Sequence, residues 1–92
     1  MEILLVALVE MAADAAEAGQ RYEDEVLALL PRHGGTLERR LREPATGNEV
    51  HVIRFADRAG YETFMTDPDR LALRARYATT APAARVLEVV PV

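Results

Sequence analysis

The residue best suited to acid–base chemistry is His51, in the middle of the segment EVHVIRF (residues 49–55). Alternate residues of an extended strand face the same side, so His51 shares a face with Glu49, Ile53 and Phe55. An imidazole on a face that lines a pocket can act as a general base or orient a substrate. The structural alternative is a histidine that is hydrogen-bonded in the core or lies at a subunit seam.

Three further residues carry groups that could assist His51. Tyr22 and Tyr61 each fall on an apolar helical stripe, so their rings should pack on a sheet while their hydroxyls seek a polar partner. If both hydroxyls reach one pocket, they can bind a carbonyl or a phenol; packing in the core is the simpler alternative. His33 nearly continues the stripe of Tyr22, although a histidine at a helix C-terminus also interacts favourably with the last carbonyls.

Other polar residues have simpler interpretations. Arg54 faces the opposite side of its strand from His51, and we expect it to pair with an acidic residue across a dimer. Asp67 precedes Pro68 and is expected to cap a helix. Glu49 and His51 could share a metal ion, but two histidines and no cysteine make a complete ligand shell hard to build. We therefore expect neither a metal nor a cofactor.

Composition argues against several classes of function. The chain has 92 residues, of which 50% are hydrophobic, and a net charge of −4, so we expect one folded domain over residues 1–92 and no nucleic-acid partner. The absence of cysteine removes disulfides, thiolate zinc sites and cysteine nucleophiles. No nucleotide fingerprint and no Gly-x-Ser-x-Gly elbow is present. No segment resembles a signal peptide or a membrane span, so we expect a cytoplasmic protein without a membrane partner.

The elements that position the candidate residues begin with a strand over residues 3–11. It is apolar on both alternating faces, which is typical of a central strand covered on both sides. A helix should follow, with Asp14 as its N-cap, and its apolar stripe is Tyr22, Val26, Leu29 and Leu30. Glu23, Asp24 and Glu25 are expected mostly on its outer face. Pro31 should end the helix, and Gly34 and Gly35 supply a left-handed stop.

The middle of the chain predicts a hairpin. Residues 36–43 are highly charged, which suits an edge strand with Leu37 and Leu41 on one face and Glu38, Arg40 and Arg42 on the other. A helix is the competing interpretation, because Leu, Glu and Arg all favour helix. Residues 44–48 (PATGN) form the loop that leads into the strand at 49–55.

The last third predicts a second helical region and a final strand. Asp57 should cap a short helix with an apolar stripe of Tyr61, Phe64 and Met65. Asp67 and Pro68 restart the helix, which should run to about Tyr77. After a loop over residues 79–83, residues 85–92 are expected to form an edge strand, with Pro91 near its end.

Two strand–helix–strand halves joined by a hairpin define the ferredoxin-like βαββαβ pattern of the α+β class. Right-handed crossovers place the helices on one face of a four-stranded antiparallel sheet, with the first and third strands central. The opposite face would then be an apolar patch too large for a monomer to leave in water. We therefore expect a homodimer that forms through this face.

The chain resembles the dimeric α/β-barrel superfamily, in particular its small bacterial domains of unknown function and, more distantly, antibiotic-biosynthesis monooxygenases. The segments that carry the resemblance are LLPRHGG (29–35), EVHVIRF (49–55) and the stretch from Tyr61 through DPDR (67–70). The resemblance implies two sheets packed face to face, helices outside, and a pocket between each sheet and its helices. The superfamily includes cofactor-independent oxygenases, cyclases, isomerases, dechlorinases, haem-degrading enzymes and proteins without known activity, so it implies no single reaction.

The leading hypothesis is a homodimeric small-molecule protein, and in particular a cofactor-independent enzyme of the oxygenase, cyclase or isomerase type. Its ligand would be an apolar or aromatic metabolite, and its machinery would be His51 helped by Tyr22, Tyr61 or His33. The alternative is a non-catalytic ligand-binding or structural dimer. A haem-degrading role is a third interpretation, in which His33 and His51 would be the available iron ligands.

Overall fold

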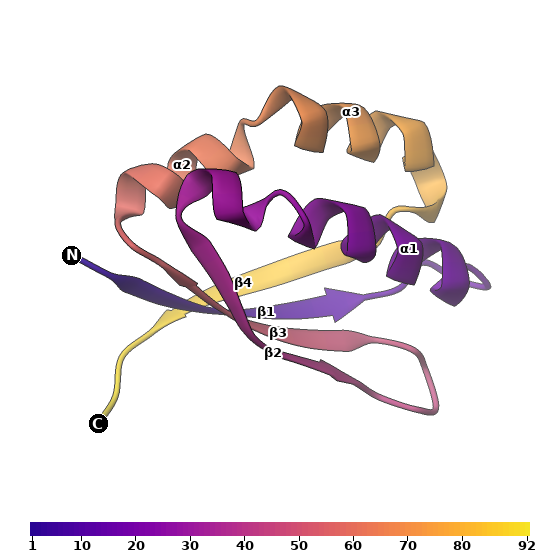
Figure 1. The fold of residues 1–92 in the computed structure, drawn as a ribbon. Coiled ribbons are helices and arrows are strands. Elements are labelled where there is room, and N and C mark those ends of the chain that lie inside the picture. The colour runs from indigo at the N-terminus through magenta and orange to yellow at the C-terminus, as the bar shows by residue number, and fades with distance from the viewer.

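The order of strands and helices is the one that the sequence predicts (Figure 1). The computed structural model describes all 92 residues. Its elements are β1 (Ile3–Glu10), α1 (Ala16–Leu27), the 3-10 turn η1 (Leu30–His33), β2 (Gly35–Arg42), β3 (Glu49–Phe55), α2 (Arg58–Met65), α3 (Pro68–Tyr77), the 3-10 turn η2 (Ala78–Thr80) and β4 (Ala83–Val89). The second helical region is divided into α2 and α3, and the fold is ferredoxin-like.

The strands form one antiparallel sheet in the order β2-β3-β1-β4. This order confirms that β1 and β3 are central, and the charged β2 is an edge strand as predicted. β1 pairs with β4 along most of its length, from Leu4 opposite Val89 to Glu10 opposite Ala83. Because β4 pairs with the far end of β1, it begins two residues earlier than expected and ends before Pro91.

The helices all lie on one face of the sheet, and the other face is left open (Figure 1). On β1 the residues that face the helices are buried, namely Ile3, Leu5, Ala7 and Val9. The alternate residues Leu4, Val6 and Leu8 lie on the open face, where Leu8 is 40% exposed. We predicted that both faces of β1 are covered. Within this chain the helices cover one face, and the other remains open.

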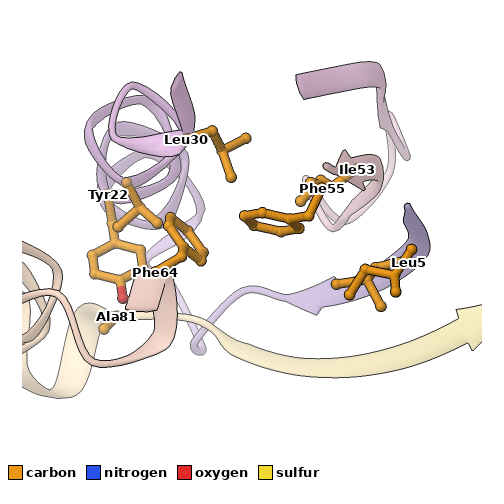
Figure 2. Packing of buried hydrophobic residues seen from close by; sticks show 9 residues of the cluster. Leu5, Tyr22, Leu30, Ile53, Phe55, Phe64 and Ala81 are labelled. Carbon is orange, nitrogen blue, oxygen red and sulfur yellow. The ribbon is translucent and has the colours of Figure 1, made fainter. Parts of the chain in front are cut away.

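The core lies between α1, α2 and the two central strands. Figure 2 shows Tyr22, Leu30 and Phe64 from the helical side meeting Leu5, Ile53 and Phe55 from the sheet. Phe55 is 1% exposed and packs on the rings of Tyr61 and Phe64, with ring centroids 5.6 and 5.7 Å away. Burial on this scale stabilises each large apolar side chain by about 1.5–3 kcal/mol.

The helix termini follow the sequence with one exception. The side chain of Asp57 accepts a hydrogen bond from the backbone of Gly60, and that of Asp67 from the backbone of Asp69, so both are N-caps as predicted. The prediction that Asp14 caps α1 is wrong. Asp14 has a φ of 58° and lies in the turn before the helix, whose N-cap, Ala15, makes no side-chain hydrogen bond.

The turn into β2 uses only one of the two glycines for a left-handed stop. Gly34 has a φ of 71° and ends η1 as predicted. Gly35 is instead the first residue of β2, and a Cβ there would crowd the side chains of Leu30 and Phe55. Its role is therefore to let the backbone approach the core closely.

A β-bulge in β2 reverses which side chains of the second half of the strand point toward the helices. The register shifts between Leu37 and Arg39, so Leu37 pairs with Ile53 on the helix face while Leu41 pairs with Val50 on the open face. The prediction that the two leucines share a face is therefore wrong. The extra residue also turns Arg40 and Arg42 toward the helix face, where both donate hydrogen bonds to Glu49.

Candidate functional site

A cavity of about 270 Å³ lies between the sheet and the helices. Thirteen of its 18 lining residues are hydrophobic, and they come from β1, α1, β3, α2 and β4. Polar groups come from Glu23, His51, Arg70 and Arg74, and from the hydroxyls of Tyr22 and Tyr61, which are among the thirteen. Ala84, Val86 and Arg74 line it while remaining exposed, so its mouth lies along the β4 edge beneath α3. A mostly apolar cavity with a few convergent polar groups has the character of a small-molecule site.

β3 places His51 on the helix side of the sheet. Its residues alternate in burial, with Glu49, His51, Ile53 and Phe55 all facing inward as the sequence predicts. His51 lies opposite Ala7 on β1 and opposite Arg40 on β2, and it is 2% exposed. The imidazole is thus part of the cavity wall and is not on the open face, where a dimer seam would lie.

Glu49 is the centre of a buried ion cluster behind His51. Its two carboxylate oxygens accept hydrogen bonds from Arg40 Nε at 2.8 Å, Arg42 Nη2 at 2.7 Å and His51 Nε2 at 2.7 Å. Burial alone would raise the pKa of Glu49, but the hydrogen bonds from Arg40, His51 and Arg42 lower that pKa to about 2. Glu49 is therefore ionised at neutral pH, which fixes the arginines and the imidazole around it.

The ionised Glu49 determines the tautomer of His51. A carboxylate can only accept, so His51 Nε2 carries a proton and donates it to Glu49 Oε1. Burial lowers the pKa of His51, and the contact with Glu49 opposes this effect only in part. The ring is then neutral at pH 7, and its Nδ1 lone pair faces Glu23, whose Oε2 is 3.9 Å away.

Glu23 is the second buried carboxyl at the cavity. The expectation that it lies on the outer face of α1 is wrong, because it is only 7% exposed and lines the cavity. Burial raises the pKa of Glu23 to about 7, with a further contribution from the negative charge of Glu49. Its one titratable neighbour within 4 Å is His51, whose Nδ1 is 3.9 Å away, too far for a hydrogen bond.

Tyr22 and Tyr61 both line this cavity, as the hypothesis of a shared pocket requires. The Tyr22 ring is 2% exposed and packs edge-on against Tyr77 with centroids 5.5 Å apart, but its buried hydroxyl has no hydrogen-bond partner. The Tyr61 ring packs on Phe55. Arg70 Nε is also buried without a partner, and Arg70 lies over the Phe64 ring.

His33 is not among the residues that line the cavity. Its ring nitrogens contact Thr63 Oγ1 at 2.9 Å and Asp67 Oδ2 at 2.6 Å, so it ties the end of η1 to the start of α3. The hydrogen bond from His33 is the main reason why the pKa of Asp67 is lowered. The structure therefore brings His51, Tyr22 and Tyr61 to one cavity and holds His33 elsewhere.

Arg54 faces the open side of the sheet, opposite to His51, as predicted. Its acidic partners lie within the same chain. Arg54 Nε donates to Glu38 Oε2 at 2.9 Å, and Nη1 lies 3.6 Å from Glu2. The expectation of a partner across a dimer is therefore replaced by an intrachain pair. No three histidine or acidic side chains are grouped so that they could hold a metal ion.

Sequence reasoning missed four polar residues of the cavity region, although the spacing of three of them indicates a shared helix face. Glu23 lies three residues before Val26 and seven before Leu30, which places it on the buried stripe of α1. Arg70 and Arg74 are one helical turn apart, the spacing of a single face. Arg40 had no signal, because only the bulge turns it inward.

Comparison with solved structures identifies proteins that share this fold. The chain has the ferredoxin-like fold of the antibiotic-biosynthesis-monooxygenase-like α+β barrel proteins. No family model matches the sequence, and no curated protein matches it significantly. None of the helices has the length and apolar character that a membrane crossing requires.

Three of these structures illustrate the likeness. SnoaB, a cofactor-independent oxygenase from Streptomyces nogalater, is 15% identical with a TM-score of 0.78, covering 98% of this chain and 92% of its own. Rv0793 from Mycobacterium tuberculosis is 17% identical with a TM-score of 0.76, covering 100% of this chain and 96% of its own. A protein from Bacteroides thetaiotaomicron, provisionally named an antibiotic biosynthesis monooxygenase, is 13% identical with a TM-score of 0.80. The match covers 98% of this chain and 89% of that protein. At these identities the likeness is one of fold.

Proposed function

We propose that this chain is a homodimeric small-molecule enzyme of the cofactor-independent oxygenase, cyclase or isomerase type. Its substrate is an apolar or aromatic metabolite bound in the cavity between the sheet and the helices. The single observation that carries this proposal is the convergence of His51, Glu23 and the unpartnered Tyr22 hydroxyl on one mostly apolar cavity of about 270 Å³. The fold that it shares with the cofactor-independent oxygenase SnoaB supports it further.

The proposed roles follow from the position of each polar group. His51, held by Glu49, lies in the cavity wall and orients the polar groups that meet the substrate. Tyr22 donates its free hydroxyl to a substrate oxygen, and Tyr61 forms part of the aromatic wall. We leave His33 in a structural role, because its ring is engaged by Thr63 and Asp67 outside the cavity.

The proposed dimer forms through the open face of the sheet. Leu8, Leu41 and Leu87 are 40%, 44% and 37% exposed on this face, beside the half-buried Val6 and Val52. A hollow of about 640 Å³ near the hairpin end of the face is lined by Leu8, Leu41 and Val50, among others. Covering this surface with a second copy would remove it from water, and the resemblance to dimeric barrels implies the same partner.

The test of catalysis is conversion without added cofactor. Wild-type protein is incubated in air with a panel of apolar and aromatic metabolites, and products are detected by mass spectrometry. We expect at least one compound to be converted, and the His51→Gln and Tyr22→Phe variants to be slower by about 100-fold and 10-fold, since each removes a positioned polar group. Conversion by both variants at the wild-type rate would contradict the proposed roles of His51 and Tyr22.

A non-catalytic ligand-binding dimer is the second candidate. The observation in its favour is that the Nε2 proton of His51 is already committed to Glu49 inside a tight ion cluster, an arrangement that also suits a structural histidine. This candidate predicts that compounds bind in the cavity and are recovered unchanged.

A further inference from the structure

Two buried polar atoms at the cavity have no hydrogen-bond partner, and a buried carboxyl beside them has no arginine within ion-pair distance. Tyr22 Oη and Arg70 Nε are fully enclosed without a partner. The Glu23 side chain is 9% exposed, and its one titratable neighbour within 4 Å is His51, at 3.9 Å. An unpartnered buried polar group usually costs about 1–3 kcal/mol, so such groups are rare unless a ligand uses them. All three residues line the same cavity.

The titratable groups around Glu23 come from four elements. Glu49 and His51 face it from β3, Arg40 from β2, and Arg70 and Arg74 from α3, while Tyr22 is its neighbour on α1. The two ionised groups nearest to His51, Glu49 and Arg40, are bonded to each other. Glu23 is therefore the carboxyl of this cluster that remains without a cation of its own.

His51 is poorly placed to take a proton from a ligand. Its Nε2 already bears a proton that is donated to Glu49 at 2.7 Å. Its Nδ1, the nitrogen with the free lone pair, lies 3.9 Å from Glu23 Oε2. Glu23, which lines the same cavity, is the other group there that can take a proton from a ligand.

We propose that Glu23 is the group that accepts the proton of a ligand O–H or N–H bound in this cavity, and that His51 is a positioning residue for it. The step is a simple proton transfer. The ligand O–H bond breaks, its electron pair stays on the ligand oxygen, and the proton forms a new bond to a Glu23 carboxylate oxygen. The Tyr22 hydroxyl then donates a hydrogen bond to the oxygen that has become negative. This inference rests on the proposed function, because it requires the cavity to bind a small molecule.

The raised pKa of Glu23, about 7, fits this task, because a general base is most effective when its pKa lies near the operating pH. It also gives the proposal a signature. Glu23 becomes a charged acceptor only as the pH rises through about 7, so a ligand with an O–H should bind more tightly above that pH. A ligand of the same shape without the hydroxyl should not respond.

The test uses 4-methylphenol and toluene, which differ by one hydroxyl, as probes titrated against the whole protein from pH 5.5 to 8.5. For wild type we expect the affinity for 4-methylphenol to rise on the order of tenfold across this range and that for toluene to stay constant. Glu23→Gln should remove the pH step while still binding toluene. Glu17→Gln, an exposed glutamate of the same helix, and His51→Gln should keep a step, the latter with a shifted midpoint.

The contrary outcomes are distinct. A step that survives in Glu23→Gln would assign the proton acceptor to another group and overturn the inference. Binding of both probes with no pH step in wild type would also overturn it while leaving the proposed cavity intact. If neither probe binds, the proposed function falls, and this inference falls with it.

Discussion

At the scale of single residues, the polar end of the site depends on Glu49. Its carboxylate is fully buried and accepts from Arg40, Arg42 and His51. Removing one partner of a buried ion cluster leaves the opposite charge without compensation, which is far more costly than never having the cluster. Glu49 therefore couples the geometry of the site to the stability of the fold.

Glu49→Gln should lower the free energy of unfolding at pH 7 by about 3 kcal/mol, measured by urea denaturation. The pKa of Glu49 is lowered in the folded state, so its contribution is present above the ordinary value of 4.5 and is lost as the pH falls toward about 2. The difference between wild type and variant should shrink over that window. Glu17→Gln is the control and should change stability by less than about 0.5 kcal/mol. A Glu49 effect that is independent of pH would contradict this account.

Tyr22→Phe should leave stability unchanged or raise it by about 1 kcal/mol, because it removes a buried hydroxyl that has no partner in the protein. The same change should weaken binding of 4-methylphenol. Tyr77→Phe is the matched control: it removes a hydroxyl that donates to Glu25 at 2.6 Å and lies on the surface. Thermal unfolding and probe titration of both variants make the comparison, and a clear loss of stability in Tyr22→Phe would show that its hydroxyl has a structural partner.

Much of the site could not be predicted from the sequence at this scale. The inward face of β3 could be predicted, because a regular strand alternates and the segment from Glu49 to Phe55 contains no interruption. The inward direction of Arg40 could not be predicted, because it depends on a β-bulge that the residue types of β2 do not indicate. Glu23 was assigned to solvent because of its charge, although its spacing from Val26 places it inward. Charge gave the wrong answer for this buried carboxyl.

At the scale of elements, two helical glycines differ in what surrounds them. A Cβ on Gly60 of α2 would overlap the backbone carbonyl oxygen of His33, whereas a Cβ on Gly19 of α1 would meet the side-chain sulfur of Met11. A backbone carbonyl cannot move without displacing η1, but a methionine side chain can adopt another rotamer. The close approach at Gly60 is what packs α2 against the turn that leads into β2.

Gly60→Ala should therefore destabilise the protein by about 1–3 kcal/mol, although alanine is the better helix former by about 1 kcal/mol. Gly19→Ala should be close to neutral, because the gain in helix propensity offsets the repacking of Met11. Urea denaturation of both variants measures the difference. If Gly60→Ala proves as stable as Gly19→Ala, the contact between α2 and η1 is looser than described.

Sequence patterns gave the type and order of the elements, because long apolar periods and the caps at Asp57 and Asp67 are local features. They misplaced the limits of β4 and the cap of α1. The start of β4 is determined by pairing with Glu10 at the far end of β1, which is not a property of its own residues.

At the scale of the whole molecule, the sheet has one covered and one open face. The helix face encloses the core and the cavity, whereas the open face carries exposed leucines on β1, β2 and β4. The two faces thus have separate roles in this account, one for the ligand and one for the second copy. A change on the open face should alter assembly without altering the fold.

Light scattering of wild-type protein at micromolar concentration should give a mass about twice the 10.2 kDa of one chain. Leu8→Glu should give a folded monomer, because it places a charge on the open face, beside the apolar hollow at its hairpin end. Leu71→Glu, on the exposed surface of α3, is the control and should remain dimeric. A monomeric wild type would contradict the proposed assembly.

The most direct test of the central claim, that a small apolar molecule binds between the sheet and the helices, is methyl NMR with toluene. Intermolecular NOEs should connect toluene to the methyl groups of Val26, Ile53 and Val86, which line the cavity. The methyl groups of Leu8 and Leu87, on the open face, should show none. NOEs confined to the open face, or none to the cavity methyls at saturating toluene, would contradict the account.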